Sequence, residues 1–473
     1  MPRVRWMNDG PMMGKVHDAN KKITLLVTTA ASFLTPFMGS SVNIALPSIG
    51  YEFSMSAILL GWVAYSFLLA AATVLVPMGR IADIWGRKRI FSFGLVIYTL
   101  SSFLCAVAVS SYSLIAFRLL QGVGGAMIFG TSIAILTSVF QVGERGRALG
   151  INVASVYLGL SAGPFLGGFL TEHFGWRSIF LINVPLGTTI FILVLWKIRW
   201  EWADAREARD EHFDYSGAFL YMAAIAAIMY GFSSLTQTLG VWLILIGLAL
   251  MITFILRERK VQNPLLDITW FRHNPVFIFS NLAALINYSA TFAVSFLLSL
   301  YLQYIKGFSP LHSGVILVAQ PVVQALFSPF AGRLSDRIEP RIVASIGMSL
   351  TAIGLGLLLL LNNRASIPFI VAVLFILGFG FALFSSPNTN AIMSSVENRF
   401  YGVASGTLAT MRLTGQMLSM GIVMLIFAFH IGDVPITPDQ YPSFMGSMHS
   451  ALIILSLLCF GGIFASLARG KIR

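Results

Sequence analysis

The chain is a succession of long apolar runs separated by short polar segments. Most runs reach the roughly 20 residues that an α-helix needs to cross a bilayer. A strand of a membrane barrel alternates polar and apolar residues over about ten positions, so these uninterrupted runs indicate helices. The sequence predicts an all-α membrane protein with fourteen transmembrane helices, at about 23–46, 57–78, 91–109, 114–140, 148–171, 178–196, 215–235, 239–256, 275–303, 313–332, 342–361, 367–392, 401–429 and 447–468.

Composition agrees with this pattern. Of the 473 residues, 57% are hydrophobic and only 11% are charged, whereas a soluble domain carries about 25% charged residues. A soluble enzyme and a disordered chain are therefore both excluded. Cys105 and Cys459 lie in apolar runs with no redox or zinc spacing. We expect no cofactor and no metal site.

The net charge of +12 would suggest a nucleic-acid partner in a soluble protein, but in a membrane protein basic residues gather in cytoplasmic loops. With the N-terminus inside, 26 of the 31 Lys and Arg fall on the inner side and three fall outside. The run that begins at Ile23 is longer than the core of a signal peptide, so we expect an uncleaved first span. The prediction is a multi-pass protein of the cell membrane with both termini cytoplasmic and no nucleic-acid partner.

A repeated motif divides the chain. Residues 79–89 (GRIADIWGRKR) and 332–337 (GRLSDR) each follow an even-numbered span and begin 253 residues apart. That offset equals eight spans, two more than a simple six-span duplication would give. The sequence therefore predicts a six-helix bundle over 1–198, a two-helix insert over 199–260 and a second six-helix bundle over 261–473. Such repeats are typical of carriers whose substrate site lies near the midplane between the halves.

The motif itself predicts a gating loop. A basic turn that satisfies the charge rule would explain the cations, but it would not explain glycines and an acid at repeated spacing. An acid such as Asp83 among cations can hold helix ends together in one conformation and release them in another. The gating residues that we expect are Gly79, Arg80, Asp83, Gly86, Arg87, Lys88, Gly332, Arg333 and Asp336.

These motifs resemble those of the major facilitator superfamily, in particular its fourteen-span drug:proton antiporter branch. Residues 79–89 match the superfamily's G-x-L-x-D-R-x-G-R-K-x loop, with Ile84 in place of an arginine. Residues 118–125 (RLLQGVGG) are similar to an R-x-x-Q-G-x-G-x pattern, and 159–168 (GLSAGPFLGG) to the antiporter signature G-x-x-x-G-P-x-x-G-G. The resemblance implies proton transfer near Arg118, Gln121 and Gly122, and an exporter with the antiporter motif Gly159, Gly163, Pro164, Gly167 and Gly168.

Glycines four residues apart also form a helix face without side chains, which allows close packing of a neighbouring helix. A proline beside that face interrupts the hydrogen bonds of the helix. Ordinary packing and a pivot for transport are both consistent with this pattern.

Polar side chains inside the spans are the candidates for a substrate cavity. Arginine is costly in hydrocarbon and should face protein or water; Arg118 is near enough to an interface to reach it by snorkelling, whereas Arg412 lies deeper. Each neutral polar group alone could equally form a hydrogen bond between helices. The cavity candidates are Ser40, Asn43, Tyr157, Asn287, Tyr288, Gln320, Asn388, Arg412 and Gln416.

The first span lacks an acid that relatives in this branch typically carry. Aligned on Asn43 and Pro47, the position of that acid is Met38, and Ser40 takes the place of a threonine. The predicted spans contain no acid but two arginines. A cavity with this charge should disfavour cations, so we expect neutral, zwitterionic or anionic amphipathic substrates. Proton coupling would then fall to Asp83 or Glu172, with His449 as a weaker candidate.

The sequence thus predicts a secondary active transporter, not an enzyme, that exports small amphipathic compounds by alternating access, coupled to protons. No GxxxxGK[ST] motif is present, which excludes an ATP-driven pump within this chain. Two alternatives stay open: an uptake permease for a small polar solute, and a membrane sensor that has the same fold but does not transport. We expect a monomer whose partners are a small-molecule substrate and the lipid bilayer.

Overall fold

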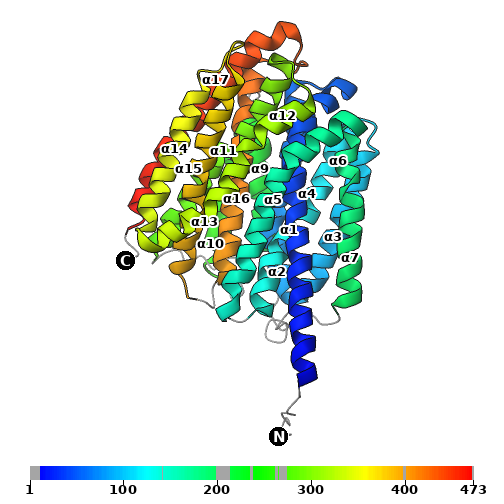
Figure 1. Ribbon diagram of the computed structural model, residues 1–473, viewed down its shortest axis with the longest axis vertical. Coiled ribbons are helices and arrows are strands. Elements are labelled where there is room, and N and C mark those ends of the chain that lie inside the picture. Colours follow the sequence, from blue (N-terminus) through cyan, green and yellow to red (C-terminus); the bar gives the residue numbers. More distant parts are fainter. Residues whose placement is uncertain are drawn as a thin grey trace.

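The computed structural model describes residues 11–140, 142–198, 213–234, 238–261, 265, 274–397 and 401–470. In this part of the chain, 14 helices are long and apolar enough to cross a membrane, which confirms the predicted span count. The helices stand side by side in one bundle (Figure 1). We call the end at which α1 begins the lower end of the bundle, and the opposite end the upper end.

The first six spans are formed by seven helices. They are α1 (Pro11–Phe53), α2 (Ala57–Trp85), α3 (Arg87–Ala106), α4 (Ser111–Val139), α5 (Val142–Phe174), α6 (Arg177–Leu181) and α7 (Asn183–Lys197). Polar caps start two of them: the Ser56 hydroxyl accepts from the Leu59 N–H at α2, and Ser110 and Ser113 form a capping box at α4.

The remaining spans follow the same up-and-down course. The seventh and eighth are α9 (Tyr215–Ser233) and α10 (Thr238–Glu258). The last six comprise α11 (Pro275–Leu300) with a π turn η2 (Tyr301–Ile305), α12 (Pro310–Leu317), α13 (Ala319–Arg337), α14 (Pro340–Leu358), α15 (Ile367–Ser394), α16 (Tyr401–His430), a short η4 (Pro438–Gln440) and α17 (Tyr441–Ala468).

Two spans are broken four residues before a proline. Proline has no N–H, so the carbonyl four residues earlier loses its helical partner. The sixth span breaks after Leu181, four residues before Pro185, and the tenth breaks after Leu317, four residues before Pro321.

The repeated motif differs from the predicted loop. It is almost entirely helical: α2 continues to Trp85, and α3 begins at Arg87. Gly86 alone separates them, with a φ of 111° that other residues rarely adopt. The second copy of the motif is the last turns of α13. A single glycine in this conformation turns the chain without a longer loop.

The two sets of six spans pack in the same way. In the first, α1 packs on α5 and α4 on both α2 and α3; in the second, α11 packs on α16 and α15 on both α13 and α14. The sets meet along two seams, one between α2 and α16 and the other between α5 and α12–α13. The division at 198 and 260 stays a prediction, which this repeated packing supports.

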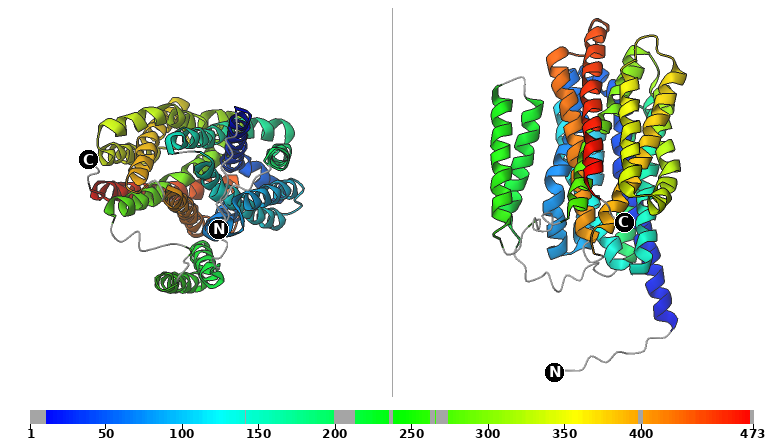
Figure 2. Two further views of the ribbon diagram at one scale, coloured as in Figure 1. Left: turned by 90° about the horizontal axis from the view of Figure 1, so that it is seen from below. Right: turned by 90° about the vertical axis from the view of Figure 1, so that its left-hand side faces the viewer.

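The pair α9 and α10 lies at one edge of the bundle (Figure 2). The pair contacts the rest of the bundle mainly through α9, which packs against α2 and α16. The Tyr65 hydroxyl of α2 donates to the Met229 carbonyl at 2.8 Å, and Tyr221 of α9 donates to the Ala72 carbonyl at 3.3 Å. The polar linker 204–214, which the sequence predicts to be a solvated tether before the seventh span, lies mostly outside the described residues.

Asp214, the last residue of the linker 204–214, caps α9 and forms an ion pair with Arg257 of α10. Burial acts to raise the pKa of the Asp214 carboxyl, but hydrogen bonds from Arg257 and from the Gly217 backbone outweigh it and hold the pKa below its usual value.

Candidate substrate cavity

A cavity of about 180 Å³ lies between the two sets of six spans. An apolar cavity of about 150 Å³ can hold benzene, so this one has room for a small organic molecule. Helices of both sets line it, whereas none of its described lining residues belongs to α9 or α10. The lining comprises Thr35, Pro36, Gly39, Ser40, Asn43, Ala64, Phe67, Leu68, Ala71, Arg118, Gly125, Ala126, Phe129, Tyr157, Leu160, Pro164, Tyr288, Thr291, Phe292, Ser295, Leu317, Gln320, Pro321, Gln324, Phe381, Ala409, Arg412, Leu413 and Gln416.

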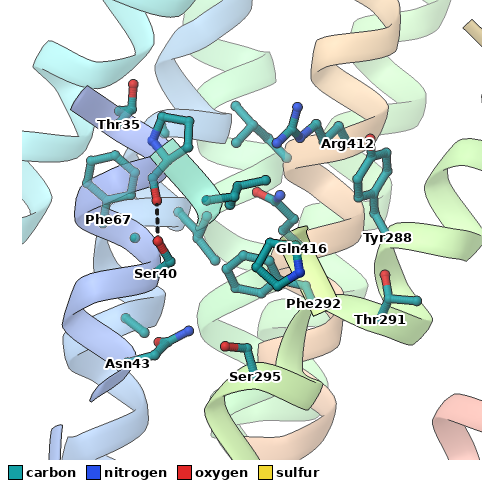
Figure 3. A pocket seen from close by; sticks show the side chains of 18 of the residues that line it. Thr35, Ser40, Asn43, Phe67, Tyr288, Thr291, Phe292, Ser295, Arg412 and Gln416 are labelled. Atoms are coloured by element: carbon teal, nitrogen blue, oxygen red, sulfur yellow. Dashed lines mark hydrogen bonds between the residues drawn. The ribbon is translucent and has the colours of Figure 1, made fainter. Parts of the chain in front are cut away.

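Arg412 projects into this cavity from α16 (Figure 3). Its guanidinium carbon lies 5.3 Å from the centre of the Tyr288 ring on α11, a distance that allows a cation–π attraction. Within the described residues, no hydrogen bond or ion pair engages this guanidinium. Its five N–H donors are thus available to a ligand.

Arg118 of α4 also lines the cavity, but two of its five N–H donors are already engaged within the protein. Its Nε donates to the Val63 carbonyl at 3.0 Å, and a second nitrogen donates to Gln121 at 2.5 Å. Gln121 in turn donates to Ser102 of α3 at 2.7 Å. The Phe67 ring lies 4.6 Å from the guanidinium. Arg118 is 1% exposed and therefore does not snorkel to the interface.

Seven of the nine predicted cavity residues line this cavity: Ser40, Asn43, Tyr157, Tyr288, Gln320, Arg412 and Gln416. The Ser40 hydroxyl donates to the Pro36 carbonyl at 2.9 Å (Figure 3). The Tyr157 hydroxyl lies 3.0 Å from that of Ser385 on α15, a hydrogen bond between the two sets.

The other two predicted residues lie elsewhere. Asn287 is fully buried on α11, and among the described residues neither of its amide atoms has a hydrogen-bond partner. Asn388 of α15 faces its own half: it donates to the Ser280 carbonyl at 3.1 Å and accepts from Arg469 at 3.0 Å. A polar residue in the middle of a span is here part of a structural network.

Arg469, directly after α17, is the centre of that network, although its position near the end of the sequence predicts only a basic tail residue. It is fully buried and donates to Asn388, to Ser280 at 3.3 Å and to the Ser466 carbonyl at 2.8 Å. Burial lowers the pKa of Arg469 to about 10, so at neutral pH it is still a cation. No signal in the sequence distinguishes it from a solvated terminal arginine.

The glycines of α5 pack chiefly against α1. A Cβ at Gly159 would lie 2.6 Å from the Phe33 carbonyl, and one at Gly163 would lie 2.8 Å from the Phe37 carbonyl. A Cβ at Gly167 would lie 2.8 Å from the Cα of Ser41 on α1. Close packing is therefore one role of this face. Gly168 differs, because a Cβ there would lie 2.5 Å from the Pro310 carbonyl of α12, across the seam.

The two copies of the motif are each tied to the fourth span of their own set. The Asp83 carboxylate accepts from Arg87 at 2.9 Å, and Arg87 donates to the Ala134 carbonyl of α4 at 3.0 Å. In the second copy, Asp336 accepts from Asn390 of α15 at 3.2 Å. Gly79 has open space around it, whereas Gly332 lies against Ser386.

Hydrogen bonds between the two sets gather at the upper end. The Ser299 hydroxyl donates to the Asn43 carbonyl at 2.6 Å, and the Ala57 N–H donates to the Val434 carbonyl at 3.0 Å. Glu172, the predicted coupling residue on α5, accepts from the Leu311 N–H of α12 at 2.9 Å. It lies at this upper contact and does not line the cavity. His449 also lies outside the lining and contacts the Leu361 carbonyl at 2.9 Å.

Comparison with known proteins decides the family. The model of the Major Facilitator Superfamily matches residues 28–257 and 281–471. The chain belongs to this superfamily. It is a multi-pass transport protein rather than an enzyme.

Relatives place it in the multidrug efflux branch. It is 30% identical over 415 residues to the multidrug resistance protein Stp of Mycobacterium tuberculosis (strain CDC 1551 / Oshkosh), covering 86% of this chain and 76% of the relative. It is 28% identical over 426 residues to the tetracenomycin C resistance and export protein of Streptomyces glaucescens, covering 88% and 78%.

Two further comparisons extend over nearly the whole chain. The riboflavin transporter RibZ of Clostridioides difficile (strain 630) is 29% identical over 443 residues, covering 94% of this chain and 96% of the relative. Among solved structures, a bacterial homologue of the human lysosomal transporter Spinster, in an inward-facing and unoccupied conformation, matches with a TM-score of 0.69 and 16% identity. That match covers 95% of this chain and 97% of the other, and it bears on the fold alone.

Proposed function

We propose that this superfamily member exports small amphipathic compounds by alternating access, in exchange for protons. The observation that carries the proposal is the cavity, which helices of both sets line and which combines aromatic rings with polar groups. A site shared by two bundles is exposed to one side and then to the other as the bundles rock. The relatives named as multidrug resistance and export proteins support the direction.

The proton would bind away from the substrate. No described lining residue of the cavity is an acid or a histidine. Asp83 at the lower end and Glu172 at the upper end both take part in contacts at the ends of the bundle. Protonation of either would weaken its contact, which would couple the proton to opening of an end rather than to direct competition with substrate.

We also propose an orientation of the protein in the membrane and a monomeric state. The lower end, at which α1 begins and α17 ends, faces the cytoplasm, in agreement with the excess of basic residues on that side. The protein resides in the cell membrane, and a monomer contains the complete cavity.

Purified protein in liposomes tests this function. A pH gradient is imposed, and uptake of labelled amphipathic dyes and nutrients is measured with the gradient in either direction. We expect dye movement opposite to the proton gradient, which collapses when a protonophore is added. Dye movement that ignores the gradient would contradict proton exchange, and no movement of any compound would contradict the transport of amphipathic compounds.

A second candidate is uptake of a polar solute, which the similarity to a protein named a riboflavin transporter favours. Right-side-out and inside-out vesicles from the same cells separate the two. Accumulation of riboflavin in right-side-out vesicles, without export of any dye from them, would favour uptake.

A further inference from the structure

The charge around the cavity is entirely positive. Arg118 contributes one guanidinium from the first set of spans, and Arg412 contributes the other from the second set. No aspartate, glutamate, lysine or histidine is among the described lining residues. A ligand in this cavity meets two cations and no carboxylate.

The two arginines are not equivalent. Arg118 donates two hydrogen bonds, to the Val63 carbonyl and to Gln121, and its guanidinium lies over the Phe67 ring. Arg412 touches the Tyr288 ring and, within the described residues, no acceptor. A cation inside a membrane protein that lacks acceptors is unfavourable, so an anionic ligand would stabilise Arg412 more than it would Arg118.

The surroundings of Arg412 suit an aromatic body behind an anionic group. Gln416 lies one helical turn further along α16 and can add amide hydrogen bonds (Figure 3). Phe292 on α11 and Phe381 on α15 line the same cavity, together with Phe67 across it. Aromatic rings bind flat apolar ligands through stacked and edge contacts.

We propose that the cavity selects aromatic organic anions, with the carboxylate, sulfonate or phenolate held by Arg412 and the rings packed among the phenylalanines. Arg118 supplies background positive charge to the cavity. The proposal rests on the proposed transport of amphipathic compounds and assigns their charge.

The test compares two dyes that share a xanthene ring system, the anion fluorescein and the cation rhodamine 123. Binding to the purified full-length protein in lipid nanodiscs is measured by fluorescence anisotropy at pH 8. We expect fluorescein to bind at least about tenfold more tightly than rhodamine 123, because hydrogen bonds to a charged group commonly contribute tenfold or more. Equal or tighter binding of rhodamine 123, or no binding of fluorescein, would overturn the proposal.

Three variants locate the effect. Arg412→Ala should weaken fluorescein binding by about 10- to 100-fold and leave rhodamine 123 binding unchanged or stronger, and Arg412→Lys should retain part of the affinity. Arg364→Ala removes an exposed arginine far from the cavity lining and should change neither. Unchanged fluorescein binding in a folded Arg412→Ala protein would overturn the assignment.

Gln416→Glu provides a second route if Arg412→Ala does not fold. It places a carboxylate one turn from Arg412, where the two can pair, and should reverse the preference toward rhodamine 123. An unchanged preference would count against the proposal. Because these assays measure binding without a gradient, they separate the two proposals: charge selectivity without transport would reject the exporter, and transport without charge selectivity would reject only the anion site.

Discussion

Asp83 links the ends of α2 and α4 through Arg87. We expect Asp83→Asn to lower transport in liposomes at least about tenfold, since it removes a charge-assisted contact that must form and break in each cycle. Its half-exposed ion pair should contribute only about 0.2–1 kcal/mol to folding, so thermal unfolding should change little.

Asp433→Asn is the matched control for Asp83→Asn. Asp433 is exposed at the upper end, so its loss should affect neither transport nor unfolding. Equal transport in the Asp83→Asn and Asp433→Asn proteins would show that the first copy of the motif is not a gate.

Arg469 carries a prediction about stability. Arg469→Ala removes the donor to the buried Asn388 Oδ1 and Ser280 Oγ atoms, and we expect it to lower the free energy of unfolding by about 3 kcal/mol. Arg364→Ala, at an exposed position, should be neutral in the same thermal unfolding assay in detergent. Similar melting temperatures for both variants would contradict a structural role for Arg469.

At the scale of a helix, Gly163 sets the distance between α1 and α5. Gly163→Ala places a methyl group against Ser40 and the Phe37 carbonyl, and overpacking of this kind costs about 1–3 kcal/mol. Gly150→Ala on the same helix meets open space and should be neutral or slightly stabilising, because alanine favours a helix over glycine. Thermal unfolding of the two variants compares them directly, and an equal effect would contradict the packing role.

The pair α9 and α10 should take no part in substrate binding. A photoreactive analogue of a transported dye is expected to label α1, α5, α11 or α16, whose residues line the cavity. Peptide mapping by mass spectrometry identifies the labelled helix. Labels found mainly in 213–258 would contradict both the cavity and the predicted insert.

The helices themselves could be predicted because span length and hydropathy are local properties of the sequence. The breaks before Pro185 and Pro321 are equally local, although the hydrophobic pattern alone did not reveal them. Whether a polar residue lines the cavity, in contrast, depends on residues that are distant in the sequence. Gln320 and Asn388 are both single polar residues within spans, but Gln320 lines the cavity. Asn388 instead binds Arg469, which lies 81 residues later in the sequence.

At the scale of the molecule, Tyr157 and Ser385 join the two sets beside the cavity. Tyr157→Phe removes one hydrogen bond of about 1 kcal/mol, which corresponds to about a fivefold shift toward conformations in which the sets separate there. Spin labels at the exposed positions 147 and 333, at the lower ends of α5 and α13, report that separation as a longer distance.

Tyr288→Phe is the control for this shift, because it keeps the ring beneath Arg412 and breaks no contact between the sets. The label distances should match those of the unmodified protein. If Tyr157→Phe gives the same distribution as Tyr288→Phe, the bond to Ser385 does not influence the conformational equilibrium.

The position of α9 makes the two seams between the sets of spans differ in what covers them. It packs on both α2 and α16 and thereby shields one seam, whereas neither α9 nor α10 packs against α5 or α13 in the described part of the chain. A compound dissolved in the bilayer therefore meets α9 at the seam between α2 and α16. At the seam between α5 and α13 it meets neither α9 nor α10. If a membrane-soluble compound enters sideways from lipid, we expect it to enter between α5 and α13 rather than at the seam beside α9.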